Sequence, residues 1–219
     1  MSLKYKCLVF DHDDTVVNST ATIHYPCFVE YMKKRGKYDG MTLEKYLIKN
    51  FEPGFIEMFR QDYGMDDDDI IDETNYWIEY VNDHIPEAYP GIKEIMEKQK
   101  NNGGLVCVVS HSMPVNILRD YIYNGLPEPD LIFGWDLPKD LVKPAPYSLN
   151  EIMRTYGLDA SDLLMIDDLK PGFDMAMNCG VEFAGVGWSY DVPYIEKFMR
   201  ANCGLYFKKV SALAEYLNG

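Results

Sequence analysis

Five short apolar runs, each ending near acidic, hydroxyl or glycine residues, restrict the possible folds of this chain more than any other feature. They are "CLVF" from Cys7, "LVCVVS" from Leu105, "DLIFG" from Asp130, "LLMIDD" from Leu163 and "EFAGVGW" from Glu182. Runs that are apolar on both faces are typical of strands in a parallel sheet covered by helices. Segments with helical periodicity lie between the runs, at residues 91–104, 114–125, 145–157 and 172–180. The alternation predicts an α/β fold with a Rossmann-like, three-layer core around a parallel sheet.

The segment between the first two runs has a different pattern. Helical periodicity without a strand is found at residues 22–36, 42–51, 54–64 and 69–85. Thr42 is a plausible cap, and the acidic run 66–69 is best explained as a helix amino terminus, since no glycine or glutamate completes an EF-hand. We therefore expect an all-helical cap at residues 17–90, inserted into a core formed by residues 1–16 and 91–219.

Composition excludes several classes of partner. The formal net charge of −14 over 219 residues disfavours bare nucleic acid and anionic membranes, both of which select basic surfaces. Five scattered cysteines without Cys-x-x-Cys spacing argue against a disulfide framework and a zinc site, and Cys7 and Cys107 are expected in the core. No leader and no bilayer-spanning apolar stretch is evident, so we expect a cytoplasmic protein. Nothing in the sequence indicates the oligomeric state.

Polar residues at the strand ends predict the position of a site. Ligands of open α/β sheets bind beyond the carboxyl ends of the strands, near the point where strand order reverses. The residues at these ends are Asp11, Asp13, Ser110, Asp167 and Asp168, and Lys143 lies in a loop before a helix. Such an oxygen-rich set suits a hard cation, Mg²⁺ above all. The cation and Lys143 would offset repulsion among the carboxylates and attract a phosphate.

These motifs, in this order, resemble those of the haloacid dehalogenase superfamily of phosphohydrolases. "DHDDT" from Asp11 resembles the Asp-x-Asp-x-Thr motif, and Ser110 resembles the second motif, a strand that ends in Ser or Thr. "KPAP" from Lys143 resembles the third motif, and "IDDLKPGFDMAMNCG" from Ile166 resembles the acidic fourth. The helical insertion is similar to the cap of the phosphoglycolate phosphatase and beta-phosphoglucomutase branch.

The resemblance implies a role for each of these residues. Asp11 would be the nucleophile that forms an aspartyl-phosphate, and Asp13 would protonate the leaving alkoxide and then deprotonate water. Ser110 would bind a phosphoryl oxygen, and Lys143 would balance the charge of nucleophile and phosphate. The magnesium ligands would be Asp11, the Asp13 backbone carbonyl, Asp168 and Asp167, the last directly or through water.

Four residues near these motifs depart from the family pattern or lack a clear role. Asp14 stands where the family usually has glycine, and we expect it to face solvent rather than to organise ligands. His12 should face away from the site in a structural role. His111 follows Ser110 and is a candidate for substrate contact. His24 lies near a histidine of the beta-phosphoglucomutase hinge, but one residue out of register, which favours a helix-packing role.

Substrate contacts from the helical insertion are expected in the loop "KNFEPGF", which begins at Lys49. Asn50 in this loop is a candidate substrate-binding residue, and Lys49 or Arg60 could bind a second anionic group. The aromatic stretch from Asn75 to Gly91 is interpreted as a helix that covers the core.

Together these features predict a magnesium-dependent phosphatase for a small phosphorylated metabolite. One alternative is a phosphomutase of the beta-phosphoglucomutase type, which uses the same aspartyl-phosphate. The other is a phospho-accepting or binding module without turnover, which the presence of both Asp11 and Asp13 disfavours.

Overall fold

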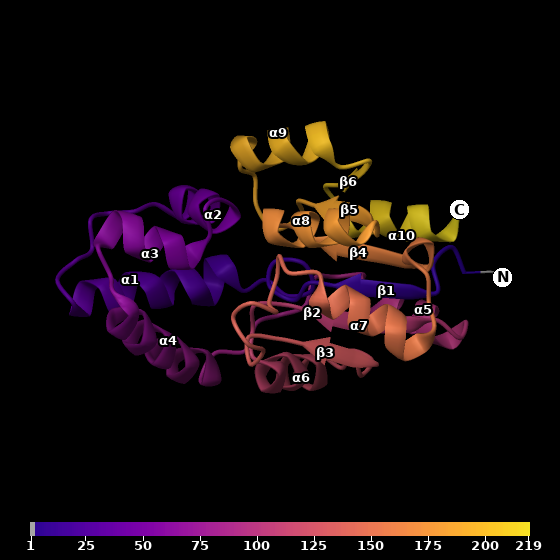
Figure 1. The fold of residues 1–219 in the computed structure, drawn as a ribbon, viewed down its shortest axis with the longest axis horizontal. Coiled ribbons are helices and arrows are strands. Elements are labelled where there is room, and N and C mark those ends of the chain that lie inside the picture. The colour runs from indigo at the N-terminus through magenta and orange to yellow at the C-terminus, as the bar shows by residue number, and fades with distance from the viewer. Residues whose placement is uncertain (1–2) are drawn as a thin grey trace.

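A six-stranded parallel sheet forms the centre of the computed structural model, which describes residues 3–219 (Figure 1). The strands are β1 (Cys7–Phe10), β2 (Leu105–Val109), β3 (Leu131–Phe133), β4 (Leu163–Asp167), β5 (Glu182–Val186) and β6 (Leu205–Phe207). Their order is β3-β2-β1-β4-β5-β6, and every neighbouring pair is parallel. The order therefore reverses between β1 and β4, as in the Rossmann fold. The predicted parallel sheet is confirmed.

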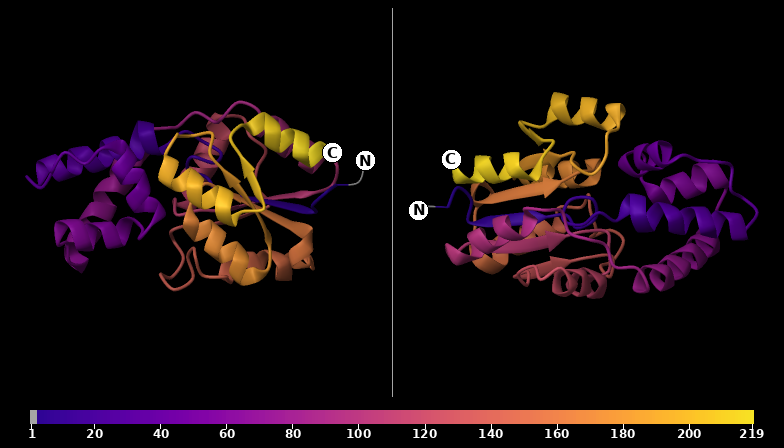
Figure 2. Two further views of the ribbon diagram at one scale, coloured as in Figure 1. Left: turned by 90° about the horizontal axis from the view of Figure 1, so that it is seen from above. Right: turned by 180° about the vertical axis from the view of Figure 1, so that it is seen from behind.

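Alternate residues of a strand point to opposite faces of a sheet. Helices cover both faces of this sheet (Figure 2). Leu8 and Phe10 belong to the same buried cluster as residues of α5 (Ile92–Asn101), α6 (Pro114–Tyr123) and α10 (Val210–Asn218). Cys7 and Val9 belong to a second cluster with α7 (Tyr147–Tyr156), α8 (Lys170–Cys179) and α9 (Pro193–Asn202). The three-layer core is thus confirmed. Cys7 is a buried core residue, as expected, and so is Cys107, with the two sulfur atoms 3.7 Å apart.

Residues 20–82 are entirely helical apart from their turns, and they lie to one side of the sheet (Figure 1). They form the π-helical turn η1 (Thr20–His24), α1 (Tyr25–Lys34), α2 (Leu43–Phe51), α3 (Phe55–Tyr63) and α4 (Asp67–Asn82). We call this group the helical segment. It has a buried apolar cluster of its own, in which Phe28, Met32 and Met58 are almost fully buried.

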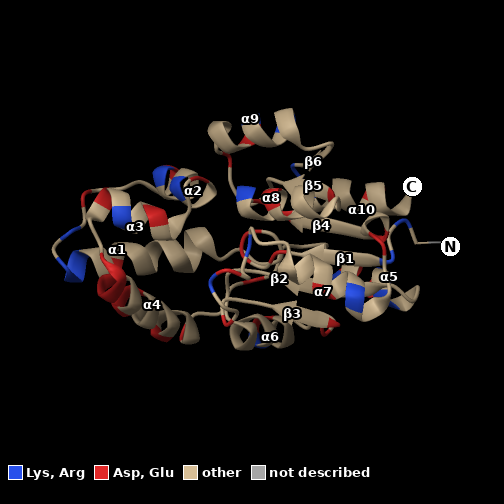
Figure 3. Cartoon of the chain, viewed as in Figure 1, with Lys and Arg blue, Asp and Glu red and all other residues tan. Residues whose placement is uncertain are grey.

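The predicted helix starts in the helical segment are confirmed. Thr42 caps α2, because its side chain accepts a hydrogen bond from the Lys45 amide. Asp66 caps α4 in the same way through the Asp69 amide. Acidic residues gather at this end of α4 (Figure 3), where they face the positive end of the helix dipole.

Two neighbouring connections join the helical segment to the sheet. The Asn18 amide donates to the Glu87 carbonyl at 2.9 Å, and the Tyr89 amide donates to the Val16 carbonyl at 2.9 Å. The outgoing and returning chains therefore run side by side. Val16 is buried in the same apolar cluster as Leu8 and Phe10, so the outgoing chain leaves from the interior of the core.

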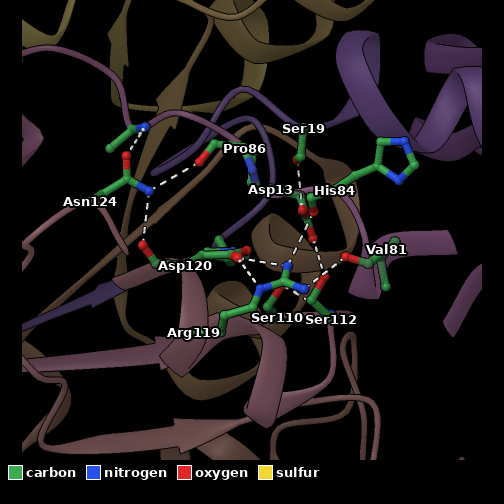
Figure 4. A network of polar contacts seen from close by, with 12 residues as sticks. Asp13, Ser19, Val81, His84, Pro86, Ser110, Ser112, Arg119, Asp120 and Asn124 are labelled. Atoms are coloured by element: carbon green, nitrogen blue, oxygen red, sulfur yellow. Dashed lines mark hydrogen bonds and ion pairs between the residues drawn. The ribbon is translucent and has the colours of Figure 1, made fainter. Parts of the chain in front are cut away.

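Arg119 of α6 and Asn124, the residue that follows this helix, fix the returning connection (Figure 4). Arg119 donates to the main-chain carbonyls of residues 81, 82 and 84 at 2.8, 3.2 and 3.3 Å. Asn124 donates to the Pro86 carbonyl at 3.0 Å and accepts from the Ala88 amide at 2.8 Å. These contacts satisfy main-chain groups that regular secondary structure leaves free.

Within residues 3–219, no helix combines the length and the apolar character needed to cross a membrane.

Candidate active site

Three carboxylates meet where the strand order reverses. Asp11 directly follows β1, Asp167 is the last residue of β4, and Asp168 follows it. One carboxylate oxygen from each lies within 4.8 Å of the others, and all three side chains are buried. Parallel strands place their carboxyl ends at one edge of the sheet, which explains why residues so distant in sequence come together.

Lys143 holds two of these carboxylates. Its Nζ lies 2.6 Å from Oδ1 of Asp11 and 2.8 Å from Oδ2 of Asp167, and all three side chains are almost fully buried. Burial alone would lower the pKa of Lys143, but the two carboxylates outweigh it and raise this pKa above its ordinary value. Lys143 therefore carries a positive charge, which can balance the negative charge of the carboxylates and of a phosphate.

The remaining negative charge fits a divalent cation. Burial raises the pKa of Asp11 to about 7 despite the nearby ammonium of Lys143. Burial and the neighbouring Asp167 carboxylate also raise the pKa of Asp168 well above its ordinary value. In their ionised forms, three carboxylates and one ammonium carry a net charge of −2, which disfavours ionisation unless a cation is bound. The donor set is purely oxygen, which is what Mg²⁺ and similar hard ions prefer.

Neighbouring groups hold Asp167 and Asp168 in position. Asp168 accepts hydrogen bonds from Thr15 Oγ1 at 3.2 Å and from the Tyr190 hydroxyl at 2.8 Å. Asp167 accepts from the Leu169 amide at 2.8 Å. Gly172 in the first turn of α8 passes so close that a β-carbon there would overlap the Asp167 carboxylate. This position therefore requires glycine because of space.

Asp13 faces the same pocket and accepts three hydrogen bonds. The donors are Ser19 Oγ at 2.7 Å, Ser112 Oγ at 2.5 Å and His24 Nε2 at 2.8 Å. Burial alone would raise the pKa of Asp13, but His24, with help from Ser112, lowers it well below its ordinary value. The structure therefore stabilises Asp13 as a carboxylate, the form that accepts a proton.

The expectation that His24 only packs between helices is wrong. Its Nε2 contacts Asp13, and its Nδ1 accepts a hydrogen bond from Trp77 Nε1 at 3.0 Å. The π-helical turn that ends at His24 changes the register of the chain, which a periodicity of 3.6 residues does not anticipate. Burial would lower the pKa of His24, and Asp13 raises it. Asp13 outweighs burial, so the pKa of His24 lies above its ordinary value, and because an indole N–H can only donate, the neutral form that accepts from Trp77 carries its proton on Nε2.

Asp14 also differs from the expectation, since it is buried rather than solvent-facing. Its Oδ1 accepts from the Thr20 amide at 3.2 Å, and burial raises its pKa. The backbone of Asp14 has a φ of +59°, a conformation that glycine adopts without strain. His12 does point away from the site, as expected, and its Nε2 lies 3.0 Å from Oδ2 of Asp120 on α6.

Ser110 and His111 line the pocket beside the carboxylates. Ser110 Oγ accepts from the Ser112 amide at 3.2 Å, which leaves its hydroxyl proton available. His111 Nε2 lies 2.9 Å from the Lys143 carbonyl, so this nitrogen carries a proton. Burial, together with the charge of Lys143, lowers the pKa of His111 to about 4. His111 is therefore a neutral wall of the pocket, and its substrate contact stays a prediction.

The helical segment forms the opposite wall of this pocket. Asn50 lines it, and its Nδ2 donates to the main-chain carbonyl of Tyr46 at 2.7 Å. The hypothesis that Lys49 or Arg60 awaits an anion is not supported. Lys49 pairs with Asp62 and Arg60 pairs with Asp67, and neither basic side chain lines the pocket.

Several residues of the site were not anticipated from the sequence. They are Ser19, Glu73, Trp77, Ser112 and Tyr190. Ser112 had a usable signal, because it lies two residues beyond Ser110 in the same strand-end loop. The others come from distant segments, and their only sequence signal was their polar or aromatic character.

A buried cluster of carboxylates and a lysine at the reversal of a Rossmann-like sheet is the arrangement of an enzyme site. Residues 8–186 match the haloacid dehalogenase-like hydrolase family, and the chain belongs to this family. The family prediction is confirmed. A phosphoglycolate phosphatase of Mesorhizobium japonicum is 25% identical over 125 residues, which are 56% of this chain and 55% of that protein. The match thus spans about half the length of this relative.

Solved structures of low identity share the fold. A Bacteroides fragilis protein described as a haloacid dehalogenase-like hydrolase aligns with a TM-score of 0.81 at 21% identity. The alignment covers 96% of this chain and 100% of that one. A predicted phosphoglycolate phosphatase from Haemophilus somnus 129pt aligns with a TM-score of 0.77 at 18% identity, covering 99% of each chain. These likenesses extend to the helical segment as well as the sheet.

Proposed function

We propose that this hydrolase is a magnesium-dependent phosphatase that acts on a small phosphorylated metabolite through an aspartyl-phosphate on Asp11. The observation that carries the proposal is the buried Asp11–Lys143–Asp167 arrangement, with Asp13 facing the same pocket. The name of the Mesorhizobium relative, a phosphatase, supports it.

The first step would be in-line attack of an Asp11 oxygen on phosphorus. The P–O bond to the organic group breaks, and the leaving oxygen takes a proton from Asp13. Lys143 and the Ser110 hydroxyl would bind the phosphoryl oxygens and stabilise their charge. Asp11, Asp167 and Asp168 would hold Mg²⁺, which supplies additional positive charge at the phosphoryl group when bound.

The second step would return Asp11 to its free form. Asp13 takes a proton from a water molecule that attacks the aspartyl-phosphate, and inorganic phosphate leaves. The three donors to Asp13 suit this step, because they favour its carboxylate. The first step needs protonated Asp13, the form that these three donors disfavour.

The helical segment would act as a cap over the pocket. Phe55 at the start of α3 packs against Trp135, with ring centroids 5.1 Å apart, and Phe51 packs against Phe198 of α9 at 5.1 Å. The first contact lies in the pocket lining, and the second joins α2 to the core outside it. A cap in this position would exclude bulk water and select the organic group of the substrate.

The test is phosphate release from a panel of phosphorylated metabolites, with Mg²⁺ and with chelator. We expect turnover that requires Mg²⁺ and falls by at least a thousandfold in Asp11→Asn. The exposed Asp140→Asn variant is the matched control and should retain activity. Unchanged activity in Asp11→Asn would exclude the mechanism. Product analysis distinguishes a phosphatase from the phosphomutase alternative. A phosphatase releases free phosphate, whereas a phosphomutase forms an isomerised sugar phosphate.

A further inference from the structure

Glu73 on α4 is a buried acid without a partner. Its side chain lines the pocket, yet the residue is only 7% exposed. Across residues 3–219, the structure shows no hydrogen bond or ion pair to its carboxylate, whose oxygen atoms are themselves not completely buried. Burial raises the pKa of Glu73 to about 7. A carboxyl group in such a position is costly for the fold, so a ligand-binding role would explain its presence.

Aromatic rings line the same pocket as Glu73. Those that line it are Tyr46, Phe55, Phe59, Trp77 and Trp135. The cavity has a volume of about 140 Å³, which suits a small metabolite. Aromatic faces attract organic cations, and an ionised carboxylate among them adds a charged hydrogen-bond acceptor. The wall formed by the helical segment therefore suits an ammonium group.

The same wall is unsuited to a second anion. Lys143 is the one lysine or arginine that lines the pocket within the described residues, and it is already paired with Asp11 and Asp167. His24 has both ring nitrogens engaged, by Asp13 and by Trp77. A carboxylate at the far end of a substrate would thus meet Glu73 without a compensating charge.

We propose that Glu73 determines specificity by binding a protonated amine on the organic group of the substrate, so that the substrate is the phosphate monoester of an amino alcohol. The inference rests on the proposed phosphatase function and names its substrate class. The substrate's negative phosphate would lie at Lys143, and its positive ammonium group at Glu73. This substrate class differs from the one in the name of the Mesorhizobium relative.

Three two-carbon phosphate esters test the proposal at pH 8, where Glu73 is ionised. O-phosphoethanolamine carries a cation at its far end, ethyl phosphate is neutral there, and 2-phosphoglycolate carries an anion. We expect kcat/KM for O-phosphoethanolamine to exceed that for the other two by about tenfold or more. In Glu73→Gln, the ratio of O-phosphoethanolamine to ethyl phosphate should fall by about ten- to a hundredfold. The exposed Glu79→Gln on the same helix should keep the wild-type ratio.

Equilibrium binding separates failure of this inference from failure of the phosphatase proposal. Calorimetry of the three esters with Asp11→Asn measures their binding without turnover. If no ester is hydrolysed but O-phosphoethanolamine still binds most tightly, the phosphatase proposal fails and the amine site stands. If 2-phosphoglycolate or ethyl phosphate is preferred in both assays, the amine site is excluded. An unchanged ratio in folded Glu73→Gln would also exclude it, and should that variant not fold, the wild-type preference decides.

Discussion

Replacing Asp11 by asparagine is expected to stabilise the metal-depleted protein, although it removes the proposed nucleophile. Burial raises the pKa of Asp11 from an ordinary value near 4 to about 7, so ionising this carboxyl opposes folding. One pKa unit corresponds to about 1.4 kcal/mol, and the penalty on the free energy of unfolding is therefore about 4 kcal/mol above pH 7. Asparagine has nearly the shape of the protonated acid and avoids this penalty.

The sign of the pH dependence follows from proton binding. Between pH 4 and pH 7 the folded state holds a proton on Asp11 that the unfolded state has lost, so the contribution of Asp11 to the stability of the wild type falls as the pH rises. The difference between Asp11→Asn and wild type should be small at pH 4, grow up to pH 7 and then level off. Urea unfolding in excess chelator at pH 4, 5.5, 7 and 8 measures it.

Two control experiments test whether the effect is specific to the buried Asp11 carboxyl. Asp140→Asn, at an exposed position, should match the wild type at every pH. Added Mg²⁺ should stabilise the wild type more than Asp11→Asn, since the variant lacks one proposed ligand. If Asp11→Asn is no more stable than wild type at pH 8 in chelator, or if its advantage does not depend on pH, the argument from burial is refuted.

Further predictions concern neighbouring residues. Gly172→Ala should weaken Mg²⁺ binding by at least tenfold in calorimetry, because the added methyl group displaces the Asp167 carboxylate; unchanged affinity would contradict the overlap. Ser112→Ala removes a donor that helps to keep the pKa of Asp13 low, so the acidic limb of the pH–rate profile should move to higher pH; a static limb would argue against Asp13 as the base. The ring protons of His111, with a pKa of about 4, should show no titration by NMR between pH 5.5 and 8.

The core of the fold follows from the sequence because its signals are local and repeated. The apolar runs that became β1, β2 and β4 are buried on both faces, and that property is visible without a structure. We predicted no element beyond residue 188, although α9, β6 and α10 are present. Strand β6 has three residues, all of intermediate exposure, and so short a run carries little periodic signal.

The residues of the site were likewise predictable only where their signal was local. The positions of Asp11 and Asp168 were predictable because each stands just beyond a strand end, and that of Lys143 because its loop resembles the third family motif. The partners of Asp13 were not, since His24 reaches it through a π-helical turn that shifts the register. The burial of Glu73 could not be predicted for another reason. Helix α4 contains several acids among its apolar residues, and only tertiary packing decides which acid is buried.

The paired connections of the helical segment have a consequence for how such a protein can be altered. Because Val16 and Tyr89 are joined by a main-chain hydrogen bond, the chain leaves the sheet and returns to it at one point, like the two strands of a stem. A turn of two to five residues is enough to link neighbouring chains of this kind. The helices could therefore be exchanged for another set, or shortened to a turn, while β1 and α5 keep their places. Substrate choice and phosphate chemistry would then be separable parts for protein engineering.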